Sequence, residues 1–380
     1  MILFVNARIF DGTGAAPYLG ELLVDGKRIA EVRRCEQVPI PREGKQVVDA
    51  AACTLMPGMT EPHAHLTWSS SLEKLAPATH LPPEELALTA ARNARILLDA
   101  GFTSAHSAGS PSRRLEVVLK KHIDSGGLPG PRLVPAGIER QPPTDVRELI
   151  NESVALGTKA VKLRIRGGSA LCAAGEQARE SGVWLTGHAQ AAEAIKLGLR
   201  AGFRLLYECT HADAEALELL EQHRDDIFVA PCVGILQATL DAMPPPHSDM
   251  SQMKADAAKV LAARSRLMPE LKRRGIRVLP GGEYGFPFNP NGRNARDLEL
   301  FVRHFGFTPT EALVAATKLG GALMGQQHEL GLLKSGYLAD LLLLQADPTQ
   351  DVRVLQDKRN FVAIMKEGAF HQTAPLAVAA

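Results

Sequence analysis

The segment at residues 159–199 decides the fold class, and it reads KAVKLRIRGGSALCAAGEQARESGVWLTGHAQAAEAIKLGL. Residues 159–165 and 183–186 are short apolar runs, which are typical of buried strands. A helix-like segment follows each run, at residues 170–181 and 191–199. Strands that alternate with helices indicate βα units, and βα units build a parallel sheet.

The same alternation extends on both sides of this segment. Between residues 54 and 279 there are about eight strand-like runs, and eight βα units suggest a closed barrel. Both ends of the chain have strand character without intervening helices. We therefore predict a (β/α)8 barrel over residues 57–329 and a small β-domain built from residues 1–56 and 330–380.

The composition is that of an ordinary globular protein, and it excludes several functions. The 380 residues are 45% hydrophobic and 22% charged, which excludes a disordered, collagen-like or coiled-coil chain. Lys and Arg number 43 and Asp and Glu 42, so the net charge is +1, without the basic excess of a nucleic-acid-binding protein. We expect neither a signal peptide at the start of the chain nor a membrane-spanning segment. We expect a cytoplasmic enzyme that acts on a small molecule, with no nucleic-acid or membrane partner, and that forms a homo-oligomer.

The five cysteines are scattered, at positions 35, 53, 172, 209 and 232. Their spacing fits neither a disulfide framework nor a paired zinc site. We expect them to be buried small apolar residues in a reducing compartment.

The first barrel strand leads into a motif with two histidines, Pro57-Gly58-Met59-Thr60-Glu61-Pro62-His63-Ala64-His65. Residues two apart on an extended segment point to the same side, so His63 and His65 can bind one divalent ion. An H-x-H pair alone is a weak signal, but barrel enzymes carry their active residues at the carboxyl ends of strands. Its place after the first strand therefore favours a metal site.

Two further residues stand on later strands. Lys162 lies between Val161 and Leu163, where a charged lysine is costly to bury. It is either an exposed lysine at a strand edge or a reactive one that takes up carbon dioxide, and the resulting carbamate can bridge two metals. His188 ends the next strand, and the alternative for it is a hydrogen-bonded core histidine.

This set resembles the amidohydrolase superfamily, in the branch with a carboxylated lysine and a binuclear site, which includes imidazolonepropionase- and prolidase-like enzymes. The resemblance covers nearly the whole chain. Besides the residues above, it includes Gly101-Phe102-Thr103-Ser104, Gly127-Leu128-Pro129-Gly130-Pro131-Arg132, Gly281-Gly282, Asn294-Ala295-Arg296-Asp297-Leu298-Glu299 and Gly336-Tyr337-Leu338-Ala339-Asp340-Leu341.

The resemblance implies a fold, a cofactor and a chemistry. The fold is a distorted (β/α)8 TIM barrel whose β-domain, made from both chain ends, is a β-sandwich. Members mostly hydrolyse amide, carbamate, urea, ester or amidine-type bonds with water that a divalent metal activates. The resemblance thus implies one or two ions, with zinc as the first expectation and manganese, cobalt, iron or nickel as alternatives.

The sequence departs from the family pattern at the sixth strand, which usually ends in a histidine. Here the segment is Leu206-Tyr207-Glu208-Cys209-Thr210-His211. Alignment through Asp213 puts Glu208 in the ligand position, and His211 can replace it only if the strand end is remodelled. Both are candidate metal ligands. A carboxylate in place of an imidazole shifts metal preference toward harder ions such as manganese.

A second departure concerns the eighth strand, which usually ends in an aspartate that binds metal and acts as the base. Glu283 stands there, in Gly281-Gly282-Glu283-Tyr284-Gly285. A glutamate can serve both roles, but its extra methylene changes its reach. We predict Glu283 as a metal ligand and as the catalytic residue.

Several residues near strand ends are candidates for substrate binding. Arg164 and Arg166 follow Lys162 and can bind a substrate carboxylate, although a solvated loop is the alternative. Four more candidates lie at the end of the second strand or after the last one, namely His106, Tyr284, Arg293 and Asn294.

Together these residues predict a metal-dependent hydrolase of a carbon–nitrogen bond other than a peptide bond, in a small-molecule amide, carbamate, urea or cyclic amide. The departures at Glu208 and Glu283 motivate a second hypothesis. In it, the same metal site catalyses a non-hydrolytic cyclisation, isomerisation or elimination in a biosynthetic or catabolic pathway. A third hypothesis is a family member that binds a ligand without turnover. The presence of the three histidines and Lys162 argues against it.

Overall fold

The computed structural model describes residues 1–70, 81–138, 145–165, 168–244 and 249–373. Arg166, which the sequence suggested as a partner for a substrate carboxylate, lies outside the described residues.

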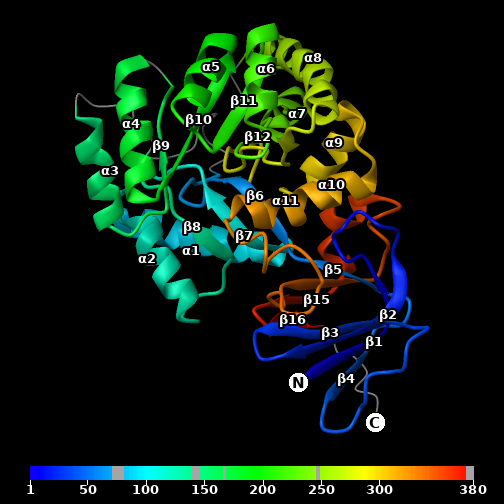
Figure 1. Ribbon diagram of the computed structural model, residues 1–380. Helices are drawn as coiled ribbons and strands as arrows, with labels where there is room; N and C mark the ends of the chain where they lie inside the picture. The colour runs from blue at the N-terminus through cyan, green and yellow to red at the C-terminus, as the bar shows by residue number, and fades with distance from the viewer. Residues whose placement is uncertain (71–80, 139–144, 166–167, 245–248, 374–380) are drawn as a thin grey trace.

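Eight parallel strands lie at the centre of the helical part of the molecule and form two hydrogen-bonded sheets (Figure 1). The first sheet has the order β6-β7-β8, with β6 (Met59–Ala64), β7 (Phe102–Ser107) and β8 (Arg132–Val134). The second has the order β13-β12-β11-β10-β9. Its strands are β9 (Ala160–Lys162), β10 (Trp184–Ala191), β11 (Leu205–His211), β12 (Phe228–Ala230) and β13 (Arg277–Val278).

The strand pairing confirms an α/β fold with parallel strands. Every pair within the two sheets is parallel, so the carboxyl ends of neighbouring strands meet at one edge. The backbone N–H of Ala160 donates to the carbonyl of Pro135 at 3.3 Å, which links β9 to the segment after β8. In the described residues no strand pairing joins the two sheets, so closure into one barrel stays a prediction.

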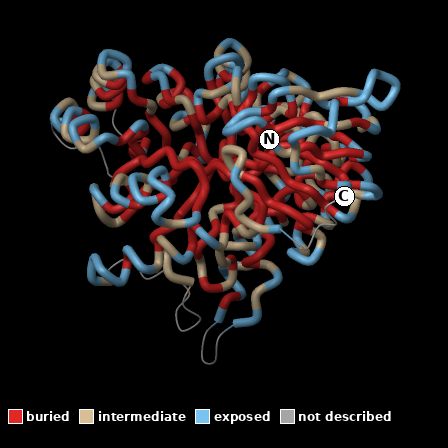
Figure 2. The backbone as a smooth tube through the Cα atoms, turned by 90° about the horizontal axis from the view of Figure 1, so that it is seen from below, coloured by how far each residue is buried: buried red, intermediate tan, exposed pale blue. Residues whose placement is uncertain are grey.

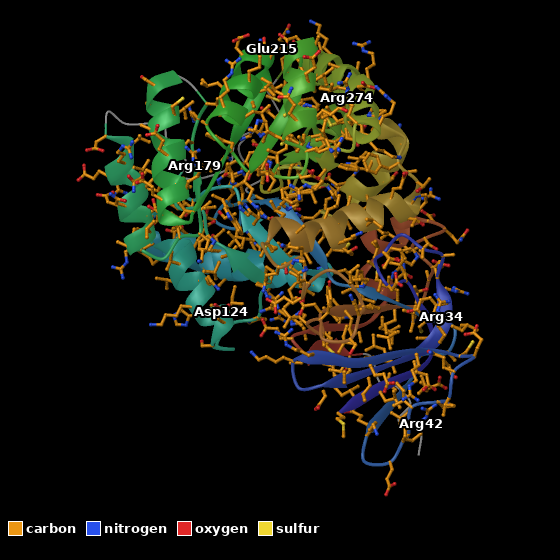
Figure 3. The ribbon with its side chains drawn as sticks, viewed as in Figure 1. Arg34, Arg42, Asp124, Arg179, Glu215 and Arg274 are labelled. Carbon is orange, nitrogen blue, oxygen red and sulfur yellow. The ribbon has the colours of Figure 1, made fainter. Side chains whose placement is uncertain are left out.

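Helices follow the strands and cover the two sheets on the outside (Figure 1). Many of their charged side chains point to solvent, as the labelled Asp124, Arg179 and Glu215 show in Figure 3. The helices are α1 (Pro83–Asp99), α2 (Leu115–Asp124), α3 (Val146–Ala155), α4 (Gly168–Ser181), α5 (Ala192–Arg200), α6 (Ala214–Gln222), α7 (Val233–Asp241), α8 (Ser251–Arg273), α9 (Arg296–Phe305), α10 (Pro309–Ala316) and α11 (Lys318–Leu323).

Local sequence explains where several of these helices begin. Pro83 occupies the first turn of α1, followed by two acidic residues, an arrangement that suits the fixed φ of proline and the positive end of the helix dipole. At the start of α6 the Asp213 side chain accepts a hydrogen bond from the N–H of Ala216 at 2.8 Å. α6 therefore starts at Ala214, three residues after the end of β11.

The main core lies between the central strands and the helices, where the backbone in Figure 2 is buried. Large side chains that are almost completely buried include Phe102, Phe203 and Phe301. Burial of one such aromatic side chain stabilises the fold by roughly 1.5–3 kcal/mol. The strands are thus held from the outside, which leaves their carboxyl ends available for polar residues.

Both chain ends contribute to a separate eight-stranded sheet. Its path is β16-β15-β14-β5-β1-β2-β3, and β4 pairs with β1. β5 and β14 pair antiparallel, so this pair joins the two ends of the chain. That a second layer makes this sheet a sandwich stays a prediction, as do the domain boundaries. The strands are β1 (Ile2–Ile9), β2 (Tyr18–Asp25), β3 (Arg28–Arg34), β4 (Gln46–Asp49), β5 (Thr54–Pro57), β14 (Leu341–Leu344), β15 (Phe361–Lys366) and β16 (Ala369–Thr373).

A buried ion-pair cluster connects this sheet to the central strands. Arg132, the first residue of β8, lies 2.7 Å from Oδ2 of Asp340 and 2.8 Å from Oε1 of Glu367. Arg132 also donates to the Ser104 hydroxyl on β7, and Asp340 accepts the N–H of Glu367. Both oxygens of Asp340 are therefore hydrogen-bonded.

Two predictions from composition can be compared with the structure. None of the described helices has the combination of length and apolarity that crossing a membrane requires. Of the five cysteines, only Cys209 and Cys232 are buried, whereas Cys35 and Cys172 are exposed. The expectation that all five are buried is therefore wrong, because Cys35 lies in the exposed turn after β3 and Cys172 lies on the exposed face of α4.

Candidate metal centre

The histidines of the H-x-H motif lie at the carboxyl end of β6. His63 and His65 are 0% and 1% exposed, and a shift in the β6–β7 register between Glu61 and Ala64 marks a local irregularity there. Among the described residues, Nε2 of His63 and both ring nitrogens of His65 make no hydrogen bond. Buried polar atoms normally have partners, so these nitrogens are oriented for something other than a protein group.

A carboxylate from a distant part of the chain completes this group. Ligand atoms of His63, His65 and Glu283 all lie within 4.8 Å of one another. Glu283 follows β13, the last central strand, so the first and last strands of the two sheets supply the three side chains. Two imidazoles and a carboxylate are donors that zinc and other divalent transition metals accept. The residues present therefore fit a divalent ion.

Burial keeps both imidazoles in the form that binds metal. It lowers the pKa of His63 and of His65 well below the usual range, and the charge of Lys162 lowers both further. Neutral imidazoles have a lone pair available for an ion. Burial raises the pKa of Glu283, while His188 and Lys162 oppose that shift.

Lys162 and His188 lie at the same centre. Lys162 is the last residue of β9 and is completely buried, which excludes an exposed lysine at a strand edge. Its Nζ lies 5.0 Å from the centre of the Tyr207 ring, and that ring stacks on His63 at 3.8 Å. The ring of His188 lies 5.4 Å from that of His63. The structure thus brings together the four residues on which the predicted metal site depends.

Glu208 contacts His188 and two further polar side chains. Its Oε2 lies 3.3 Å from Nδ1 of His188, and its Oε1 accepts from Gln190 at 2.7 Å. The guanidinium of Arg264, which extends from α8, lies 3.4 Å from the same Oε1. Burial alone would raise the pKa of Glu208, but the His188 hydrogen bond and the charges of His188 and Arg264 outweigh it and lower that pKa. Glu208 is an ionised partner of His188, and it is outside the group of His63, His65 and Glu283.

A cavity of about 560 Å³ opens beside these residues. Its volume is in the range of small-molecule sites. Its polar lining consists of Arg164, His188, Gln190, Glu208 and Glu283, and its apolar lining of Ile165, Ala191 and Ala194.

The backbone is unusual where the strands enter the site. Glu208 and Cys209 in β11, Cys232 after β12 and Glu283 after β13 all have left-handed φ values, between 47° and 78°. L-residues other than glycine rarely adopt this region, which costs on the order of 1–3 kcal/mol each. Strain of this kind collects at functional sites because it directs side chains to places that regular strands do not reach.

Comparison with known proteins shows the family to which the chain belongs. A sequence profile described as the amidohydrolase family matches residues 54–370. The chain belongs to the amidohydrolase family. This confirms the resemblance found in the sequence, and the family generally uses divalent metals.

Three individual relatives share less than a quarter of their aligned residues with this chain. Ochratoxinase from Aspergillus niger is 24% identical over 258 residues, which cover 63% of this chain and 50% of that protein. The chain therefore spans about half the length of the curated relatives it matches first. A Xaa-Pro dipeptidase with bound methionine superposes with a TM-score of 0.82 at 21% identity, covering 98% of this chain and 99% of that one. Phenylurea hydrolase B superposes with a TM-score of 0.81 at 18% identity, covering 100% and 98%. These likenesses show a shared amidohydrolase fold.

The two sixth-strand candidates of this amidohydrolase lie apart. His211 is exposed at the end of β11 and lines a separate hollow with Ala263 and Arg266 of α8. It lies three positions after Glu208, and the left-handed bend at Glu208 and Cys209 turns the strand between them. The structure therefore does not bring His211 to the metal centre, contrary to its prediction as a ligand.

Of the predicted substrate-binding residues, some line the cavity and others do not. Arg164 lines the cavity. His106 is buried inside the strands, where Nδ1 lies 3.0 Å from the Ser107 carbonyl and burial lowers its pKa to about 3. Arg293 is exposed, and it does not contribute to the cavity lining.

Tyr284 and Asn294 support the centre from behind. The Tyr284 hydroxyl donates to Oδ1 of Asp297 at 2.8 Å, and Asn294 donates to Oε2 of Glu61 at 2.7 Å. Oε1 of Glu61 accepts the backbone N–H of His63, so Asn294 steadies the histidine motif indirectly. The substrate-binding prediction for both residues is not supported, because their side chains point into this buried network.

Sequence reasoning missed Arg264 and the contact of Cys232. Arg264 is 1% exposed and lies within a long charged helix, where nothing in the sequence distinguishes it from solvent-exposed arginines. The Sγ of Cys232 lies 3.1 Å from Nδ1 of His63. The position of Cys232 two residues after a strand was the available signal.

Proposed function

We propose that this amidohydrolase is a metal-dependent hydrolase that cleaves a carbon–nitrogen bond in a small molecule. The observation that carries the proposal is the convergence of His63, His65 and Glu283 within 4.8 Å beside a cavity of about 560 Å³. A set of metal donors that faces a cavity of this size is an expected arrangement for metal-assisted hydrolysis.

His63, His65 and Glu283 would hold the ion, with Lys162 and His188 beside them. A divalent ion supplies Lewis acidity, which lowers the pKa of water and polarises a carbonyl group. Carboxylation of Lys162 by carbon dioxide would add an anionic ligand with two oxygens and would allow a second ion. Zinc is the first expectation for the metal, with manganese, cobalt, iron and nickel as alternatives.

Glu283 has the position of a general base. It lines the cavity and also belongs to the donor group, so its carboxylate can reach both an ion and a substrate. It would take a proton from water at a carboxylate oxygen and pass it to the leaving nitrogen. Burial raises its pKa, which strengthens it as a base.

Arg164 suggests what the substrate carries. It is exposed at the rim of the cavity, where a guanidinium can bind a carboxylate with two parallel hydrogen bonds. We therefore propose an amide or related compound that bears a carboxylate. The named relatives include a dipeptidase and a phenylurea hydrolase, so the test panel includes both peptide and non-peptide bonds.

The test uses purified protein loaded with zinc or manganese. It measures bound metal by elemental analysis and turnover on N-acyl amino acids, Xaa-Pro dipeptides, carbamates, phenylureas and cyclic amides. We expect His63→Ala to lose metal and activity. His304→Ala is the matched control, because His304 lies on α9 and contacts Gln237 outside the centre.

The outcomes separate the three hypotheses. Metal far below one ion per chain would contradict the proposal and favour a ligand-binding protein. Metal with no turnover on the whole panel would contradict hydrolysis. Turnover whose product mass shows no added water would favour cyclisation, isomerisation or elimination.

Some structural expectations also stay proposals. We propose that the eight central strands close into a distorted barrel over residues 57–329, with residues 1–56 and 330–380 as a sandwich domain. A cytoplasmic homo-oligomer without nucleic-acid or membrane partners is proposed from composition alone.

A further inference from the structure

Cys232 lies at the back of the metal centre, in direct contact with one of its histidines. It is completely buried after β12, at the residue that precedes α7. Its Sγ lies 3.1 Å from Nδ1 of His63. The group of donors that could share an ion contains His63, His65 and Glu283 but not Cys232, so the thiol contacts the centre from outside.

The hydrogen bonds of the thiol determine which nitrogen of His63 carries hydrogen. The Cys232 thiol donates to the carbonyl of Ala230 at 3.6 Å. A thiol has a single hydrogen, so toward His63 the sulfur is an acceptor and Nδ1 must be the donor. Nε2 then keeps its lone pair, and this is the ring nitrogen without a hydrogen-bond partner among the described residues.

The ring of His63 is also held in orientation. Tyr207 stacks on one face at 3.8 Å, with an angle of 22° between the ring planes. Stacking fixes the plane of the ring, and the contact with Cys232 fixes its rotation within that plane. Together they direct Nε2 away from the thiol.

Arg264 holds the backbone that presents the thiol. The φ of Cys232 is 48°, a left-handed conformation that is unfavourable for cysteine. Arg264 donates to the carbonyl of Pro231 at 2.5 Å and to that of Cys232 at 3.3 Å. It also donates to Thr210 at the end of β11. One buried guanidinium thus joins two strand ends and keeps the strained residue in place.

We infer that Cys232 is a positioning residue that fixes the tautomer and orientation of His63, so that Nε2 faces a divalent ion. Ligating histidines commonly donate their second N–H to a carboxylate or a carbonyl, and loss of that partner weakens metal binding about 10–100-fold. A thiol fills this place here. The inference rests on the metal centre of the proposed function.

The test compares metal affinity among variants by competition with a chelator. We expect Cys232→Ala to bind zinc about 10–100-fold more weakly. Cys232→Ser should recover most of this affinity, because a hydroxyl can also accept from Nδ1 and donate to Ala230. Cys209→Ala is the matched control, since Cys209 is equally buried and has a similar φ of 47°. Its metal affinity should equal that of the wild type.

Several results would overturn the inference. Equal zinc affinity in Cys232→Ala and the wild type would do so, as would an equal loss in Cys209→Ala, which would indicate general loosening. With cobalt, a thiolate-to-metal charge-transfer band that disappears in Cys232→Ala would show that the sulfur is itself a ligand.

A measurement on the wild type covers the case in which Cys232→Ala does not fold. Nitrogen NMR of protein with labelled histidine should show His63 as the Nδ1–H tautomer, and the Nε2–H tautomer would contradict the inference. If the wild type binds no metal at all, the proposed centre fails. If the wild type binds metal and Cys232→Ala binds it equally well, only the role of Cys232 fails.

Discussion

Two buried polar clusters lie at different places along the central strands, and they differ in how their hydrogen bonds are satisfied. At the amino end of β8, Arg132 is paired with Asp340 and Glu367, and both oxygens of Asp340 accept hydrogen bonds. At the carboxyl ends, nitrogens of His63 and His65 are buried without a partner among the described residues. The first cluster joins two sheets, and the second is open toward an ion.

The difference shows that buried polar groups can either hold parts of the fold together or bind a ligand. A buried charge that is fully paired specifies how two parts of a fold meet, at a cost in desolvation that the partners offset. A buried polar atom without a hydrogen-bond partner destabilises the fold. Such an atom is retained where it binds a ligand. Substitutions in the first cluster should therefore change stability, and those in the second should change activity.

The largest expected effect is on catalysis, in Glu283→Gln. Removing the base should lower kcat about 10²–10⁴-fold. Stability should not fall, because a neutral amide is easier to bury than a carboxylate. Rate, bound metal and thermal unfolding are measured together. An unchanged kcat would show that Glu283 is not the base.

The matched control for this variant is Glu116→Gln. Glu116 is a buried glutamate that accepts from Ser107 and from the N–H of Ala136. Its replacement should leave kcat near the wild-type value. A comparable loss of rate there would mean that any buried charge affects catalysis.

The next effect concerns stability, in Arg132→Met. The side chain of Asp340 is 2% exposed, so the variant leaves a buried carboxylate without its main partner. Such a change costs about 3–5 kcal/mol, measured as the free energy of unfolding in denaturant. Zinc affinity should not change. The double variant with Asp340→Leu should recover much of the loss, and no recovery would argue against the pair as the cause.

A third effect is the pH dependence of stability. Burial raises the pKa of Glu116 from 4.5 to about 7. The folded state therefore binds this proton more tightly than the unfolded state, and stability is lost as pH rises from about 4.5 to about 7. One such group contributes roughly 3 kcal/mol to that change.

In Glu116→Gln the free energy of unfolding should change less steeply with pH. The measurement is a series of unfolding curves from about pH 4 to about pH 8, which covers the titration range of the group. The variant should not abolish the pH dependence, because burial also raises the pKa of Glu61 to about 7. Parallel curves for wild type and variant would refute the assignment.

The smallest effect is on substrate affinity, in Arg164→Gln. Because Arg164 is exposed, solvent weakens its attraction for a carboxylate. KM should rise about tenfold for a substrate with a carboxylate, which corresponds to about 1.4 kcal/mol. The KM of a neutral analogue is the control. If both KM values rise equally, Arg164 has a structural role instead.

Much of the architecture could be predicted from the chain alone. Apolar runs separated by helical segments indicated parallel strands, because burial on both faces requires continuous apolar sequence. The same runs placed Lys162 within a strand and His188 at the end of the next one, whereas in the structure Lys162 is the last residue of β9 and His188 lies within β10. Candidate metal donors that follow strands could be recognised, since parallel strands bring their carboxyl ends together.

Predictions for the loops after the strands were less successful. Tyr284 and Asn294 follow the last strand as expected, but they point into the network with Asp297 and Glu61. His211 lies only three positions from Glu208 and yet faces a different hollow. The direction in which side chains point in these segments depends on residues with a left-handed backbone conformation, which no local pattern of the sequence reveals.

The sequence by itself determined the alternation of strands and helices, the family, and the candidate donor residues His63, His65 and Glu283, with Lys162 and His188 on neighbouring strands. These follow from periodicity and from motifs that are local in the chain. Only the tertiary structure decided that Glu208 pairs with Arg264, 56 positions away on α8, and that Cys232 contacts His63, 169 positions away. Contacts between distant segments depend on how the helices pack against the strands, and side-chain packing in three dimensions leaves no periodic trace in the sequence.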